Sequence, residues 1–153
     1  MTRPIAIQDT YPEDASHCYG CGRLNDVGYQ IKTRLHGDTA LTIFEPWSQH
    51  IAYEGTVYGG LIASVIDCHS AGTAAIFTMI DAGVAVGSEP SPRFVTAHLE
   101  VDFLAPTPLD RMEIVGRLVE MTDRKAIVES ELLVDGKVTA RGSAVLVRIN
   151  DDV

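Results

Sequence analysis

Cysteine, tryptophan and basic residues are scarce in this chain, and each shortage excludes something. The 153 residues include 3 cysteines and 1 tryptophan. An odd number of cysteines cannot form a complete set of intramolecular disulfides, so we expect a reducing, cytoplasmic location. Only 12 Lys and Arg stand against 21 Asp and Glu, giving a formal net charge of −9. This balance argues against a nucleic-acid partner and against an anionic membrane surface.

Long uncharged runs are also rare. The one exception extends from Gly55 to Ile80, where Asp67 is the only charged residue, and no apolar stretch of signal-peptide type stands at the N-terminus. Glycine, serine and threonine dilute the run, and a charge near the middle of a membrane span is costly. We therefore expect a helix buried inside a protein core and no membrane span.

The overall composition is that of one globular domain. Hydrophobic residues make up 46% and charged residues 22% of the chain, and a chain of this length buries enough surface to fold without a disulfide or metal. Proline and glycine are frequent near the N-terminus. We expect an N-terminal loop segment over 1–28 packed on the domain, a single domain over 29–149, and a tail over 150–153.

Hydrophobic periodicity predicts six strands and one helix. Residues 95–103 alternate apolar and polar side chains, which is the period of a half-buried strand. Asp135-Gly136 and a Gly37-containing segment predict hairpin turns. One apolar helix among six strands requires a sheet that wraps it, an α+β fold. The expected order β-β-α-β-β-β-β comprises strands 29–35 and 39–44, a helix from about 59 to 79, and strands 95–103, 112–121, 126–134 and 138–149.

Asp67 is the first candidate for chemistry. It lies about two turns inside the predicted helix, where Asp is a poor helix former, and apolar residues surround it. Desolvation raises the pKa of a carboxyl group and makes it a candidate base or nucleophile. The alternative is a carboxylate bonded to a neighbouring strand or reaching water at a dimer seam.

Gly59 and Gly60 form the second candidate, at the start of the same helix. Glycines there leave the free backbone N–H groups open to a ligand, and the helix dipole favours negative charge at that end. This is the physical basis of an oxyanion hole. The alternative is a loop that needs a positive φ.

The spacing of these two candidates predicts a dimer. Gly59 and Asp67 are eight residues apart, which is ~12 Å along one helix. One substrate carbonyl therefore cannot reach both within one chain. A two-fold dimer with antiparallel helices would bring Asp67 of one subunit to Gly59 of the other.

The cysteines suggest neither a metal nor a redox pair. His17-Cys18 and Cys21 resemble half of a zinc site, but the second ligand pair is missing, and Cys68 and His69 fall in the predicted helix. We expect no metal. No phosphate-binding loop or dinucleotide motif is present, so we also expect no cofactor.

Two segments resemble hotdog-fold acyl-CoA thioesterases of the PaaI / 4-hydroxybenzoyl-CoA type. The family motif is His-Gly-Gly with an acidic residue nine positions after the His; Gly59, Gly60 and Asp67 match it, and Tyr58 stands at the His position. Residues 95–106 resemble the family's Ser/Thr-x-x-Leu-x-x-x-(Phe/Tyr)-x-x-Pro strand, with Thr96 at the Ser/Thr. Residues 18–28 resemble a Cys-x-x-Cys-Gly prelude found in one branch.

The resemblance implies hydrolysis of an acyl-CoA or acyl-carrier thioester to a free acid and a thiol. The Gly59 N–H would bind the carbonyl oxygen, Asp67 would attack or activate a water, and Thr96 would orient it. Tyr58 can donate a hydrogen bond as an imidazole does, but it cannot act as a cation near neutral pH. The resemblance also implies a homodimer that pairs again into a homotetramer.

Several points stay open from the sequence. Arg93, Arg124, Lys125 and Arg141 are candidates for binding CoA phosphates, or are solvated surface charges. A hydratase or dehydratase of the same fold would need an Asp–His pair, for which His69 or His98 is available. A non-catalytic acyl-CoA-binding module is the other alternative, and Tyr58 is the residue that favours it.

Overall fold

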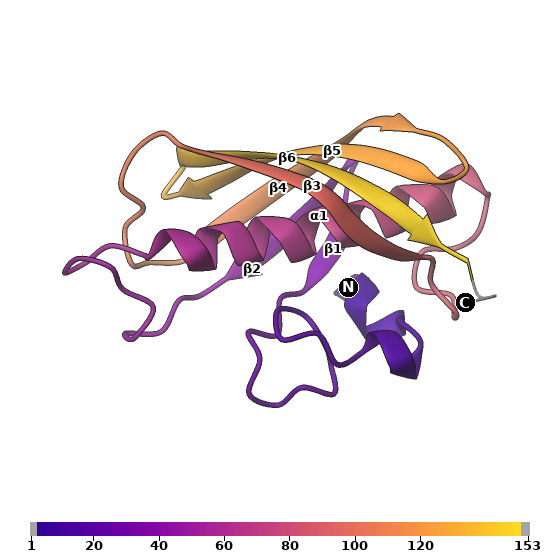
Figure 1. The fold of residues 1–153 in the computed structure, drawn as a ribbon, viewed down its shortest axis with the longest axis horizontal. Coiled ribbons are helices and arrows are strands. Elements are labelled where there is room, and N and C mark those ends of the chain that lie inside the picture. The colour runs from indigo at the N-terminus through magenta and orange to yellow at the C-terminus, as the bar shows by residue number, and fades with distance from the viewer. Residues whose placement is uncertain (1–2, 151–153) are drawn as a thin grey trace.

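A computed structural model describes residues 3–150 of the chain. Six antiparallel strands form one sheet that curves over a single long helix (Figure 1). Across the sheet the order is β1-β2-β4-β5-β6-β3. The predicted α+β hotdog fold with order β-β-α-β-β-β-β is confirmed. The elements are β1 (Thr33–His36), β2 (Thr39–Phe44), α1 (Gly59–Asp81), β3 (Arg93–Phe103), β4 (Met112–Met121), β5 (Lys125–Val134) and β6 (Lys137–Ile149).

A tight turn sets the register of the β5–β6 hairpin. Asp135 and Gly136 both have positive φ, 49° and 77°, as the two-residue turn between β5 and β6 requires. The first strand is shorter than predicted. It starts at Thr33, because Gln30 takes a φ of 57° and donates its side-chain amide to the carbonyl groups of Gly22 and Asn25. Residues 29–32 are thereby held by the N-terminal segment.

Packing against the sheet accounts for the apolar character of α1. The helix is long and apolar enough to cross a membrane by length and composition, yet 67% of its most apolar window is buried. Leu61, Val65, Ile66 and Ile76 are fully buried. Their side chains form the core between α1 and the concave face of the sheet.

A bulge interrupts β3, which is an edge strand. In the described part of the chain β3 pairs only with β6, and the pairing shifts at Ala97, between Thr96 and His98. The extra residue resets the alternation. Thr96 and Leu99 consequently face α1, whereas Val95 is 47% exposed. The predicted half-buried alternation is therefore wrong for the first part of this strand.

The N-terminal segment lies on α1 away from most of the sheet (Figure 1). It contains two short 3-10 helices, η1 (Ile7–Thr10) and η2 (Glu13–Ala15). Ile7 is fully buried, and the side-chain amide of Gln8 exchanges two hydrogen bonds with Thr33 at the start of β1. Residues 1–2 and most of the predicted tail, 151–153, lie outside the described residues.

Candidate active site

Asp67 and Thr96 meet between α1 and β3. The Thr96 hydroxyl donates a 2.5 Å hydrogen bond to Oδ1 of Asp67. The β-bulge makes this contact because it turns Thr96 toward the helix. Asp67 is half-buried, at the edge of the helix surface that the sheet covers. Two predicted site residues are thus brought together.

A cavity of about 160 Å³ opens beside this pair. Its walls come from three parts of the chain: Tyr11 and two cysteines of the N-terminal segment, Asp67 and Cys68 of α1, and the start of β3. The carboxylate therefore faces a space that a small group or water can enter. The predicted alternative was a carboxylate bonded to a neighbouring strand, and Oδ1 of Asp67 does accept such a bond from Thr96 of β3.

Gly59 and Gly60 form the first residues of α1. Tyr58 is the N-cap residue in an extended conformation, with φ −72° and ψ 145°. Among residues 3–150 no acceptor is recorded for the Gly59 N–H, as is usual for the first donors of a helix. A Cβ on Gly60 would lie 2.5 Å from a ring carbon of Tyr58. The Tyr58 ring therefore requires glycine at position 60.

Gly59 and Asp67 stay far apart within the chain. Their eight-residue separation along one continuous helix is ~12 Å. The strand β3 runs beside this stretch, with Thr96 at Asp67 and the Phe103 ring beside Gly59, 3.3 Å from where a Cβ would stand. The two halves of the predicted site thus lie at the two ends of the stretch from Gly59 to Asp67.

The Tyr58 hydroxyl is bonded to another tyrosine. Its oxygen lies 2.8 Å from that of Tyr29, and this hydrogen bond raises the pKa of Tyr29. The Tyr29 ring contacts His50 edge-on, with centroids 5.5 Å apart. Tyr58 thus belongs to an aromatic cluster beside Gly59. Tyr29 and His50 were not predicted as site residues, because neither lies in a motif.

Neither candidate histidine pairs with Asp67. His69 is fully buried, burial lowers its pKa to about 3, and its Nδ1 lies 2.8 Å from the Thr42 hydroxyl. His98 is exposed and lies 3.1 Å from Glu100. In the described residues the Asp–His pair expected of a hydratase or dehydratase is not formed.

Comparison with known proteins identifies the family. A sequence model of the thioesterase superfamily matches residues 54–146, from the loop before α1 into β6. The chain belongs to the thioesterase superfamily. The crystal structure of a thioesterase superfamily protein from Shewanella loihica PV-4 is 40% identical, with a TM-score of 0.65 over 91% of this chain and 100% of that one.

More distant structures share the fold alone. The PaaI protein of the E. coli phenylacetic acid degradation operon has a TM-score of 0.64 at 14% identity, covering 80% of this chain and 81% of that one. A Haemophilus influenzae thioesterase has a TM-score of 0.65 at 11% identity and covers 80% of each chain. No curated protein sequence matches.

In this thioesterase a group of three thiols borders the Asp67 cavity. The sulfur atoms of Cys18, Cys21 and Cys68 all lie within 4.8 Å of one another. Hydrogen bonds from the Cys21 and Cys68 thiols lower the pKa of Cys18, and the same contacts with Cys18 raise the pKa values of the other two. This cluster was not predicted, because Cys68 is distant from Cys18 and Cys21 along the chain.

Three of the predicted cations lie at the same end of the sheet as Thr96. Arg93 is the first residue of β3, lines the Asp67 cavity and donates to Asp14 at 2.7 Å. Lys125 pairs with Val147 of β6, which pairs in turn with Val95. Two strand spacings, about 10 Å, thus separate Lys125 from β3. Arg124 directly precedes it.

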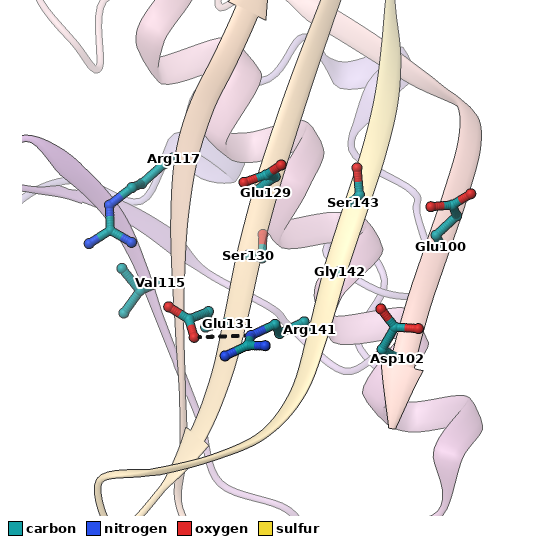
Figure 2. A pocket seen from close by; sticks show the side chains of 10 residues that line it. All are labelled: Glu100, Asp102, Val115, Arg117, Glu129, Ser130, Glu131, Arg141, Gly142 and Ser143. Carbon is teal, nitrogen blue, oxygen red and sulfur yellow. Dashed lines mark hydrogen bonds and ion pairs between the residues drawn. The ribbon is translucent and has the colours of Figure 1, made fainter. Parts of the chain in front are cut away.

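Arg141 is placed differently from the other cations. It lies in a hollow of about 390 Å³ on the sheet face opposite α1, and its Nε is 3.4 Å from Glu131 (Figure 2). Carboxylates outnumber guanidinium groups there, and this local charge disfavours binding of a phosphate. The charged residues of the hollow are Glu100, Asp102, Arg117, Glu129, Glu131 and Arg141.

Proposed function

We propose that this thioesterase hydrolyses an acyl-CoA, or an acyl-carrier thioester, to a free acid and a thiol. Superfamily membership supplies the reaction class. One observation carries the assignment of machinery to residues: the Thr96–Asp67 hydrogen bond at the wall of an open cavity. The reaction as proposed uses side chains, backbone donors and water, with no cofactor.

The proposed chemistry follows from the two ends of the site. The thioester carbonyl oxygen accepts a hydrogen bond from the Gly59 N–H, assisted by Gly60 and the positive end of the helix dipole. Thr96 holds Oδ1 of Asp67, so Oδ2 takes a proton from a water that attacks the carbonyl carbon, or attacks it directly. When water attacks, the carbon–sulfur bond breaks to give the free acid, and the thiolate takes up the proton that Asp67 had accepted. When Asp67 attacks, the carbon–sulfur bond breaks to leave an acyl-Asp67 anhydride, which a water then hydrolyses to the free acid while the thiolate is protonated from solvent.

We infer that two subunits share each site. The outer edge of β3 is available for a second copy. A two-fold axis through Glu100 would pair Leu99 with the partner subunit's Val101, and the bulge at Ala97 would then place Thr96 opposite the partner subunit's Phe103. Because Phe103 stands beside Gly59 in each chain, this pairing brings Asp67 to the partner subunit's Gly59.

Surface composition supports this pairing. Val95 and Phe103 of the edge strand are 47% and 57% exposed, more apolar surface than an edge strand normally leaves in water. The side of α1 that the sheet leaves uncovered carries small residues, which permit close approach of a second helix. These residues are Gly60, Ala63, Ser64 and Ala71, with Asp67 among them.

The CoA phosphates would bind basic side chains near the Thr96 end of β3. Arg93, Arg124 and Lys125 lie within reach of the Thr96 end of β3. Guanidinium and ammonium groups recognise phosphate through charge-assisted hydrogen bonds. Arg141, beside Glu131 on the opposite sheet face, is not proposed for this role.

A panel of acyl-CoA thioesters tests the proposed function. Purified protein is incubated with short, long and aromatic acyl-CoAs, and free CoA is separated by chromatography, because Cys18 is exposed and would itself react with a thiol reagent. We expect enzyme-dependent release of CoA from at least one member. Tight binding without release from any member would contradict hydrolysis and favour a non-catalytic acyl-CoA-binding module.

A further inference from the structure

We propose that Cys18, Cys21 and Cys68 bind one zinc ion, which fastens the N-terminal segment to α1 beside the active site. The two ligands from the N-terminal segment and the one from the helix are far apart in sequence and adjacent in space. This inference departs from the expectation of no metal, because the sequence alone does not show Cys68 beside the other two. It is independent of the proposed hydrolysis.

The distances fit a tetrahedral ion. The sulfurs of Cys18 and Cys68 are 3.9 Å apart, and all three sulfurs lie within 4.8 Å of one another. Zinc–sulfur bonds of 2.3 Å at tetrahedral angles hold their sulfurs about 3.8 Å apart. Small side-chain movements would therefore bring the three thiolates onto one ion.

The backbone around Cys18 is arranged as a metal-binding turn requires. The Gly22 N–H donates to the Cys18 carbonyl at 2.8 Å and closes a tight turn that contains both Cys18 and Cys21. A Cβ on Gly22 would overlap the Cys18 backbone, so this turn needs glycine after the second cysteine.

Three soft ligands also select the ion. Thiolate sites favour zinc or copper(I) over hard cations such as magnesium. In the described residues no fourth His, Cys, Asp or Glu ligand atom joins the group, so a water from the neighbouring cavity would complete the tetrahedron. Cys18 is exposed whereas Cys21 and Cys68 are buried, which gives the ion a path of entry.

The first experiment measures metal content. Wild-type protein is purified under reducing conditions from zinc-supplemented cells, desalted and subjected to elemental analysis beside Cys68→Ser and His17→Ala. We expect about one zinc per wild-type chain, since three thiolates hold zinc tightly. Cys68→Ser should lose it. His17 adjoins Cys18 in sequence but lies outside the cluster, so His17→Ala should keep the ion.

A second measurement uses wild-type protein only, so that the proposal remains testable if Cys68→Ser fails to fold. Apoprotein made with a strong chelator is titrated with Co²⁺ and then Zn²⁺. We expect Co²⁺ to produce thiolate-to-cobalt charge-transfer absorption, and Zn²⁺ to abolish it. We also expect the apoprotein to be less thermally stable than the zinc-bound protein, and zinc to restore that stability. Two results would overturn the zinc site. One is purified protein that contains no zinc and, after addition of Co²⁺, shows no charge-transfer absorption. The other is a Cys18–Cys21 disulfide in freshly isolated protein.

Discussion

At the scale of single residues, the carboxylate of Asp67 and the hydroxyl of Thr96 act together. Their 2.5 Å hydrogen bond crosses from α1 to β3, and a charged acceptor makes such a bond stronger than a neutral one. It fixes one carboxylate oxygen and thereby aims the other. The contribution expected of Thr96 is orientation, which lowers the barrier without direct participation in bond making.

Replacing Thr96 tests this orientation. Thr96→Val keeps the shape of the side chain and removes the hydroxyl, so we expect kcat to fall about 10- to 100-fold, the equivalent of one hydrogen bond to a charged group. Thr96→Ser keeps the hydroxyl and should retain most activity. Steady-state kinetics on a single acyl-CoA compares the two variants. Equal losses in both would show that the hydroxyl is not what matters.

Tyr58 should contribute less than Asp67. Tyr58→Phe removes the hydroxyl that bonds to Tyr29, and a neutral hydrogen bond of about 1 kcal/mol corresponds to a ~5-fold loss in kcat/KM. Tyr29→Phe breaks the same bond from the other side and should have a similar effect. A loss in Tyr58→Phe alone that reaches the size of the Asp67→Asn effect would place the phenol in the chemistry itself.

At the scale of elements, local sequence patterns predicted most boundaries well. The Asp-Gly turn and the apolar run of α1 act over a few residues, and the boundaries of β2 and β4 coincide with those observed. The bulge at Ala97 was missed, because an extra residue leaves the apolar alternation of the sequence unchanged. Its presence depends on pairing with β6. The contact of Thr96 with Asp67 depends on that pairing in turn.

The loop before α1 should make stability depend on pH. His50 is 7% exposed, burial lowers its pKa, and its Nδ1 accepts the Trp47 N–H at 2.9 Å. As the pH falls through about 6.5, the His50 side chain therefore takes up a proton in the unfolded chain before it does so in the folded chain. The free energy of unfolding should fall below that pH, by at most about 1.4 kcal/mol per pH unit for one proton.

Urea unfolding at several pH values measures this dependence. His50→Gln should show a shallower decline than wild type between about pH 7.5 and pH 5.5, whatever its overall stability. His36→Gln, at an exposed position in the β1–β2 hairpin, serves as the matched control and should follow wild type. If the free energy of unfolding changed with pH in parallel for wild type and His50→Gln, His50 would take up its proton equally in the folded and the unfolded chain, and this prediction would be wrong.

At the scale of the whole molecule, candidate site residues were easier to predict from the sequence than contacts between distant parts of the chain. The spacing of Gly59 and Asp67 and the resemblance of residues 95–106 gave the candidates, and Thr96 does meet Asp67. The thiol cluster and the Tyr29–Tyr58 bond escaped prediction, because each joins residues before β1 to α1 or its N-cap across a long stretch of chain. Such contacts depend on the fold as a whole.

Subunit mixing tests the shared site. Gly59→Pro removes the N–H at the first helical position, where proline is well tolerated and the extended Tyr58 suits a following proline. Asp67→Asn removes the acid. Each homodimer should lose at least ~10²-fold in activity. A heterodimer isolated through two different tags keeps one complete site, and we expect about half of wild-type activity per dimer.

Two controls accompany the mixing experiment. Sedimentation at micromolar concentration should show a dimer, or the tetramer formed when dimers pair again, for wild type and both variants. The second control is a heterodimer of one chain that carries both substitutions and one wild-type chain. Each of its two sites combines one substituted residue with one intact residue, so this heterodimer should stay inactive. Full activity of a wild-type monomer, or no recovery in the mixed heterodimer, would contradict a site built from two chains.

The measurement that bears most directly on the whole account is acyl-CoA turnover by Asp67→Asn. The amide keeps the size of the side chain and still accepts the Thr96 hydroxyl, but it can neither take a proton nor attack a carbonyl. We predict unchanged circular dichroism and sedimentation with a loss of ~10²–10⁴-fold in kcat, or more if Asp67 is the nucleophile. A folded, dimeric Asp67→Asn protein as active as wild type would contradict the assignment.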